Sequence, residues 1–165
     1  MPLKYIILSI GITLLLLIFL LFIIIKMIDK KRVTQITFIL EKYGDLKKQK
    51  KKNYEYYLNG EPYHLLLWKV SNMGEVVFNS PTIWEINNFT NPKRVNQTQF
   101  VSKQHKKIVI IYPFNGQIKR WRNENELEFV TPDISIWNMN IIKHTELEKI
   151  LEKTKKDYQN ELTRS

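Results

Sequence analysis

The pattern of hydrophobic and polar positions begins with a stretch of 21 residues, from Tyr5 to Ile25, that contains no charged side chain. It is rich in Leu, Ile and Phe, and only one Ser, one Gly and one Thr interrupt it. A helix of this length rises about 31 Å, which matches the thickness of the hydrocarbon core of a bilayer. The stretch has no polar face, whereas a helix in the core of a soluble protein normally carries one. The pattern therefore predicts a transmembrane helix over residues 5–25, preceded by a short flank of residues 1–4.

The alternative interpretation of this N-terminal apolar stretch is a cleavable signal peptide. A signal peptide has a shorter apolar core, followed by a site with small residues before a polar mature chain. Here the apolar run ends in Lys26-Met27-Ile28-Asp29-Lys30-Lys31-Arg32, without such a site. The chain is therefore predicted to keep the segment as a signal-anchor and to be a single-pass protein of the cell membrane.

The charges on the two sides of the span predict its orientation. Before the span the only charged side chain is Lys4, whereas residues 26–52 contain ten basic and three acidic side chains. Basic flanks stay on the cytoplasmic side, so the C-terminal part is expected in the cytoplasm. The same block is expected to contact anionic lipid head groups of the bilayer. The residues assigned to this contact are Lys26, Lys30, Lys31, Arg32, Lys47, Lys48, Lys50, Lys51 and Lys52.

Residues 26–52 are predicted to form a basic juxtamembrane helix and a linker. Apolar residues recur at helical spacing between Val33 and Tyr43, which predicts a helix there. The lysine-rich stretch Lys47–Lys52 is interpreted as a solvated linker. The folded domain is accordingly placed at residues 53–165.

This domain is expected to be rich in strands, because Asn-Gly pairs separate apolar runs in two places. Asn59-Gly60 and Asn115-Gly116 each predict a β-hairpin, since both turn positions favour positive φ. The continuous apolar runs Leu65–Trp68 and Ile108–Ile111 predict strands that are covered on both faces. Shorter strands are expected at Leu127–Val130 and at Ile134–Trp137, with a long polar loop between the hairpins at residues 87–102.

A C-terminal helix is predicted to provide the cover on one face of the sheet. Thr145 and Glu148 have the spacing of a capping box, so the helix is expected to start near Glu146. Its apolar residues Leu147, Ile150, Leu151 and Tyr158 then share one side. The predicted class is α+β: a single transmembrane helix, followed by a β-rich antiparallel sheet with a C-terminal helix.

The net charge of +10 is distributed unevenly along the chain. Residues 26–52 carry +7, and residues 53–165 carry only +2. Within the domain, residues 93–122 contain no acidic side chain, and this basic strip is a candidate for binding a polyanion such as nucleic acid. The alternative is that its last members pair with Glu124, Glu126 and Glu128 on a neighbouring strand. The strip residues singled out are Lys103, Lys106, Lys107, Lys119, Arg120 and Arg122.

The sequence contains few residues or motifs that are typical of a catalytic site. The chain has no Cys, which excludes disulfides, Cys-ligated metals and a thiol nucleophile, and its three His residues are scattered. No phosphate-binding loop, nucleophile elbow or metal-binding motif is present. Glu75 and Glu85 lie in apolar surroundings and are considered either as acid–base groups or as solvated strand residues. No catalytic residue, metal or cofactor is predicted.

The order of the predicted elements resembles that of the restriction-endonuclease-like nuclease core. That core holds metal with an acidic residue followed by Glu-x-Lys on a neighbouring strand. In Glu85-Ile86-Asn87 an Asn stands where the Lys is required, so the chain is not assigned to this family.

Two function classes follow from the sequence. The first is a non-enzymatic interaction module, tethered to the cytoplasmic membrane surface, that binds a protein partner or the membrane. Trp84, Trp121 and Trp137 are its candidate anchor residues, with core packing as the alternative for each. The second is a membrane-associated nucleic-acid-binding or degenerate nuclease-like domain that uses the basic strip.

Overall fold

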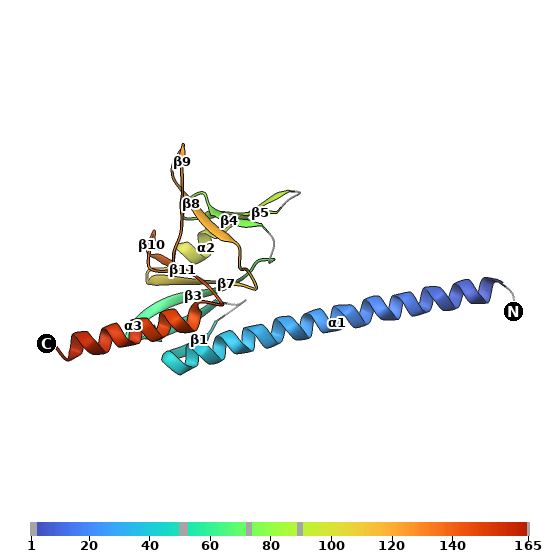
Figure 1. The fold of residues 1–165 in the computed structure, drawn as a ribbon, viewed down its shortest axis with the longest axis horizontal. Helices are drawn as coiled ribbons and strands as arrows, with labels where there is room; N and C mark the ends of the chain where they lie inside the picture. The colour runs from blue at the N-terminus through green and yellow to red at the C-terminus, as the bar shows by residue number, and fades with distance from the viewer. Residues whose placement is uncertain (1–2, 50–52, 72–73, 89–90, 165) are drawn as a thin grey trace. The chain divides into compact units, whose positions relative to one another are not determined.

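The computed structural model describes residues 3–49, 53–71, 74–88 and 91–164 of the chain (Figure 1). It divides into two units, Met1–Gln35 and Ile36–Ser165. The boundary between them lies inside the first helix.

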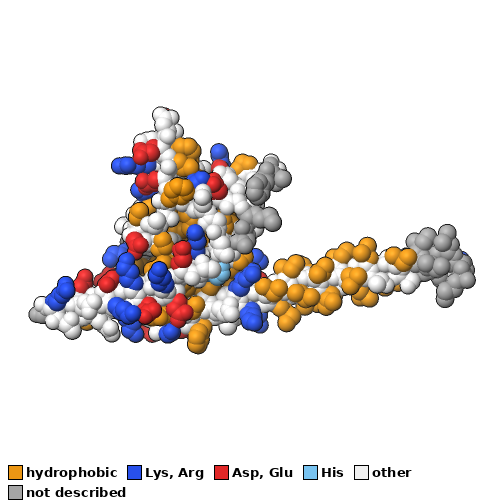
Figure 2. All heavy atoms as spheres, viewed as in Figure 1, with side chains coloured by type: hydrophobic (Ala, Val, Ile, Leu, Met, Phe, Trp, Pro, Cys, Tyr) orange, Lys and Arg blue, Asp and Glu red, His pale blue; other side chains and the backbone are white. Residues whose placement is uncertain are grey.

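Helix α1 covers Leu3–Tyr43, and its N-terminal part makes up the first unit. The apolar side chains described between Leu8 and Ile28 are all exposed, and Figure 2 shows them covering this part of the helix. In the described part of the chain, α1 is the only helix that is long and apolar enough to cross a membrane. The Thr13 hydroxyl donates to the Ser9 carbonyl oxygen at 2.9 Å, so a polar group within the apolar stretch is satisfied along the helix. The predicted span is therefore a candidate membrane helix in the structure.

The second unit contains two β-sheets and two further helices, which confirms the α+β layout. The first sheet has the strand order β1-β2-β3-β7-β11-β10, and the second has the order β6-β5-β4-β8-β9. The strands of the first sheet are β1 (Asp45–Lys48), β2 (Asn53–Leu58), β3 (Glu61–Lys69), β7 (Lys106–Tyr112), β10 (Ser135–Ile136) and β11 (Met139–Lys143). Those of the second are β4 (Glu75–Phe78), β5 (Ile83–Asn87), β6 (Pro92–Asn96), β8 (Gln117–Asn123) and β9 (Glu126–Phe129). The helices are α2 (Thr98–Val101) and α3 (Leu147–Leu162).

The first predicted hairpin is confirmed. Strands β2 and β3 pair antiparallel with Leu58 opposite Glu61. Asn59 and Gly60 form the turn between them with φ angles of 53° and 82°. Both turn residues therefore have the left-handed conformation that a two-residue hairpin requires.

The second predicted hairpin is wrong, because β7 belongs to the first sheet and β8 to the second. Neither Asn115 nor Gly116 has a positive φ. Gly116 is instead a point of close approach, since a Cβ atom there would lie 2.4 Å from the Gly74 carbonyl oxygen. The missing side chain of Gly116 thus allows two backbone segments to approach closely where the chain crosses from one sheet to the other, and no tight turn is formed.

Two such crossings explain why the sheets are mixed rather than antiparallel throughout. The chain passes from β3 to β4 and later from β7 to β8, each time moving from the first sheet to the second. As a result, β3 pairs parallel with β7, and β4 pairs parallel with β8. Strand β11 then adds to β7, again in parallel. The remaining strand pairs are antiparallel, which is the arrangement that the sequence analysis expects for the sheet, although β1, β6 and β11 are not among its predicted strands.

Three short elements differ from the sequence prediction. The stretch expected to be a long loop contains β6 and α2. The strands expected near residues 127 and 134 are present as β9 and β10, but β11 was not predicted. Its turn uses Trp137 and Asn138 at φ 49° and 61°, so the usual glycine signal is missing.

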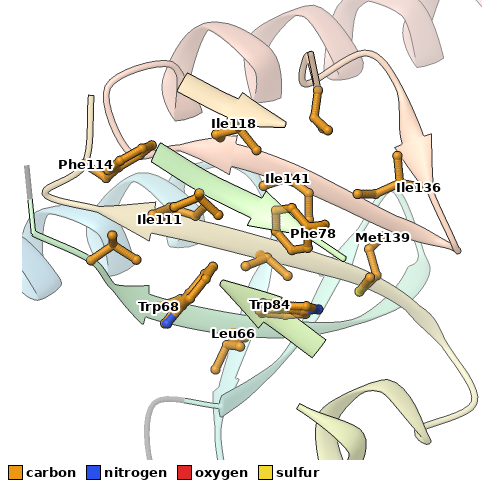
Figure 3. Close-up of a cluster of buried hydrophobic side chains, with 14 of the residues drawn as sticks. Leu66, Trp68, Phe78, Trp84, Ile111, Phe114, Ile118, Ile136, Met139 and Ile141 are labelled. Atoms are coloured by element: carbon orange, nitrogen blue, oxygen red, sulfur yellow. The ribbon is translucent and has the colours of Figure 1, made fainter. Parts of the chain in front are cut away.

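The main core lies between the two sheets (Figure 3). Trp84 packs against Trp68 and Phe78, with ring centroids 5.1 and 5.0 Å away respectively. The opposite face of the first sheet is covered by α3, whose Leu147 and Leu151 are buried and whose Ile150 and Leu151 lie beside Ile108 and Ile142. This confirms that the apolar runs in β3 and β7 are covered on both faces. The capping box does not form: Glu146 is the N-cap without a side-chain hydrogen bond, and the Thr145 hydroxyl donates to Asn115.

The end of α1 and strand β1 belong to the compact unit, which begins at Ile36 rather than at residue 53. Leu40 is 0% exposed, and its carbonyl oxygen accepts a hydrogen bond from the Tyr56 hydroxyl at 3.2 Å. Lys47 and Lys48 lie in β1, which pairs with β2, and so are not in the solvated linker expected there. Lysines suit this edge strand, because their charge discourages another chain from pairing with the open edge of the sheet. The rest of the expected linker, Lys50, Lys51 and Lys52, lies outside the described residues.

Candidate functional site

Among the described residues, those assigned to the membrane surface fall into two groups. Lys26, Lys30, Lys31 and Arg32 lie on α1 in the first unit. Lys47 and Lys48 are exposed on β1 in the compact unit, and the Lys47 ammonium lies 5.1 Å from the centre of the Tyr57 ring. Contact of these groups with anionic lipid stays a prediction.

The basic strip does not form one uniform surface. Arg120 pairs with Glu128 across β8 and β9, and Arg122 pairs with Glu126 at 3.3 Å. These are the cross-strand pairs that the sequence offers as the alternative to polyanion binding. Lys119 pairs with Glu75 at 2.6 Å, and Lys106 lies 3.9 Å from Glu61. In contrast, Lys103 and Lys107 donate to neutral oxygen atoms.

The two carboxylates considered for acid–base chemistry are both ion-paired. Glu75 accepts a hydrogen bond from Lys119. Glu85 accepts one from Arg94 at 2.9 Å and one from the Asn79 amide at 3.2 Å. Both carboxylates thus have basic partners on the neighbouring strands, as in structural ion pairs on a sheet surface. This arrangement favours the structural interpretation over the catalytic one.

The tryptophans divide between core and surface. Trp84 is completely buried, whereas Trp121 and Trp137 are 41% and 37% exposed. Trp121 lies opposite Leu127 in the β8–β9 pair, and Phe129 lies opposite Lys119. These side chains alternate with the core-facing Ile118, so they project from the face of the second sheet that is directed away from the first.

We call this surface the outer patch and define it by its exposed apolar members. On β5, Ile83 lies on the same face as Glu85, and it extends the patch along the sheet. Phe129 is the most exposed member at 60%. Sequence reasoning singled out Trp121 alone, although the alternation of Glu and apolar residues in β9 already placed two more on one face. The members are Ile83, Trp121, Leu127 and Phe129.

Two of the three histidines lie together. The rings of His64 on β3 and His105 before β7 are 5.3 Å apart between centroids. His144 follows β11, and its backbone N–H donates to the Ile111 carbonyl oxygen. Among the described residues, no group of three His, Cys, Asp or Glu side chains is arranged to hold a metal ion.

Comparisons with protein-family models, with curated proteins and with solved structures find no match to this chain. No family is therefore assigned to it.

Proposed function

We propose that this protein is a single-pass membrane-anchored interaction protein, whose compact unit faces the cytoplasm and binds a protein partner through the outer patch. The outer patch is the observation that carries the proposal. The candidate membrane helix supports the anchoring, and the basic residues that follow it support the cytoplasmic orientation.

The size and composition of the outer patch support a protein partner. Its side chains are between 40% and 60% exposed, which amounts to roughly 350 Å² of apolar surface for residues of this size. Patches of a few hundred Å² on a monomer often mark interaction sites. Trp and Phe also provide a large contact area with few rotatable bonds, so little entropy is lost on binding.

The charges around the outer patch indicate the chemistry of that partner. Lys119 and Arg94, which lie on the same face as the patch, are each paired with a carboxylate of the same sheet. A nucleic acid or an anionic membrane would have to compete with these carboxylates for the basic groups. An apolar protein surface can bind to the patch without displacing these carboxylates from the basic groups. The proposed partner is therefore a protein that offers an apolar surface to the patch, with polar groups around it.

Site-specific photo-cross-linking in native membranes tests this proposal. A photoreactive amino acid is placed at Phe129 in the full-length protein, and a matched control carries it at Phe38. Phe38 is 68% exposed and lies on α1, outside the outer patch. We expect a discrete protein adduct from position 129 that is absent from position 38 and is lost when Leu127→Ser is added.

Each other outcome contradicts the proposal in a defined way. Adducts to lipid alone would assign the outer patch to the membrane. Adducts that are removed by nuclease would support the nucleic-acid alternative. Equal protein adducts from both positions, or adducts that persist with Leu127→Ser, would show that the patch is not a specific surface.

A further inference from the structure

A row of charged and titratable side chains crosses the first sheet at the end where β3 and β7 begin. In register across three strands, Glu55 on β2 lies opposite His64 on β3, which lies opposite Lys107 on β7. His64 and Lys107 are only 8% and 5% exposed. The loop before β7 adds Lys103 and the exposed His105, whose ring contacts that of His64. We call this group the His64 cluster; its members are Glu55, His64, Lys103, His105 and Lys107.

The lysines of the His64 cluster differ from the ion-paired basic residues of the compact unit. The Lys107 ammonium donates to the His105 carbonyl oxygen at 3.0 Å, and the Lys103 ammonium donates to Gln49 Oε1 at 2.8 Å. Both partners are neutral, whereas Lys119 and Lys153 have carboxylates as partners. A buried ammonium without an anionic partner is costly, because desolvation is not offset by charge pairing.

The carboxylate of Glu55 is held by a different group. The Gln49 amide Nε2 donates to Glu55, so Gln49 stands between this carboxylate and Lys103. The His64 cluster therefore contains one carboxylate and two ammonium groups, before either imidazole gains a proton. This leaves an excess of positive charge around a nearly buried site.

The imidazole of His64 has an unused hydrogen-bonding position. Its Nδ1 atom is buried and has no hydrogen-bond partner among the described residues. Burial lowers the pKa of His64, and so do the charges of Lys103, His105 and Lys107, whereas Glu55 opposes the shift. An anion placed beside His64 would reverse this balance and favour the imidazolium, which donates from both ring nitrogens.

From this juxtaposition we infer that the His64 cluster binds a phosphate group. A phosphate dianion supplies the negatively charged partner that the ammonium groups of Lys103 and Lys107 lack. Its oxygens accept hydrogen bonds from ammonium and imidazolium groups. His105 is exposed and Lys103 is partly exposed, so both can receive the ligand from solvent. The phosphate can belong to a lipid head group or to a soluble phosphorylated molecule. This inference is independent of the proposed function, because the His64 cluster lies on the first sheet and the outer patch on the second.

The titration of His64 in the full-length protein tests the inference. The protein, with ¹⁵N-labelled histidine, is placed in nanodiscs of phosphatidylcholine and titrated with inorganic phosphate, against sodium chloride of equal ionic strength. We expect saturable shifts of the His64 ring resonances and a higher pKa of His64 with phosphate. A second sample contains phosphatidate in the nanodisc and no inorganic phosphate, which separates a lipid source from a soluble one.

Matched lysine variants make the test specific. Lys103→Gln and Lys107→Gln should each weaken phosphate binding about tenfold or more, since each removes a charged hydrogen bond. Lys149→Gln, an exposed change on α3, should leave the affinity unchanged. Lys103 is only partly buried, so this variant is informative even if Lys107→Gln fails to fold.

Shifts with either phosphate source that depend on Lys103 support the inference, and the responding sample identifies the source. The absence of shifts in both samples would overturn it. Shifts that sodium chloride reproduces, or that survive both lysine variants, would also overturn it.

Discussion

Replacement of Leu40 by Ala provides a direct measure of how far the compact unit extends into α1. Leu40 is 0% exposed, and the hydroxyl of the buried Tyr56 donates to its backbone carbonyl oxygen. The substitution removes buried methyl groups and leaves a cavity between α1 and β2. Buried Leu→Ala changes cost about 2–5 kcal/mol, and full burial places Leu40 near the middle of this range, at about 3 kcal/mol.

The control for this substitution is Phe38→Ala on the same helix. Phe38 is 68% exposed, so its truncation should change the free energy of unfolding by no more than about 0.5 kcal/mol. Urea unfolding of the full-length protein in detergent is followed by tryptophan fluorescence, since Trp68 and Trp84 lie in the core. With a urea slope of about 1.5 kcal/mol per molar, Leu40→Ala should lower the midpoint by about 2 M and Phe38→Ala by less than about 0.4 M.

The result decides between two domain boundaries. If the folded domain began at residue 53, both substitutions would lie outside it and would have equally small effects. Equal midpoints for the two variants would therefore refute the packing of α1 described above. A large effect of Leu40→Ala alone would also imply that a fragment of residues 53–165 lacks part of its core and unfolds more readily than one that starts at Ile36.

Three further predictions concern other parts of the chain. Gly116→Ala should lower the free energy of unfolding by about 2 kcal/mol or more in the same urea assay, since its Cβ would lie 2.4 Å from the Gly74 carbonyl oxygen. Gly11→Ala, with open space around it, serves as the control. Because the pKa of His64 is lowered in the folded state, the unfolded chain binds the extra proton first. Stability should therefore fall as the pH drops below about 6.5, the ordinary histidine value, and His64→Asn should flatten this dependence; an unchanged slope would contradict the assignment. Finally, changing Lys26, Lys30, Lys31 and Arg32 to Gln should produce mixed topology. In the unaltered protein a C-terminal tag should resist protease added to intact cells, and its digestion would contradict a cytoplasmic location.

The sequence alone was sufficient for three features whose pattern is local. An uncharged run of 21 residues predicts a membrane span, and α1 has the length and apolarity of a candidate span. Asn59-Gly60 predicts the β2–β3 hairpin, because the turn geometry depends on these two residues. The spacing of Leu147 and Leu151 predicts the buried side of α3, because the helical repeat brings them to one face.

The tertiary structure decided everything that depends on which distant segments pair. Asn115-Gly116 has the same two residues as the first turn, but β7 belongs to the first sheet and β8 to the second. The residues of a strand do not by themselves determine which other strand it pairs with. The same is true of β1, whose lysines suggest a solvated linker until the backbone pairing with β2 is known. Glu55, His64 and Lys107 are scattered along the chain, and they form one row only because β3 pairs with β2 on one side and β7 on the other. Local preference acts over a few residues, whereas strand pairing is selected by the burial of the whole core between the two sheets.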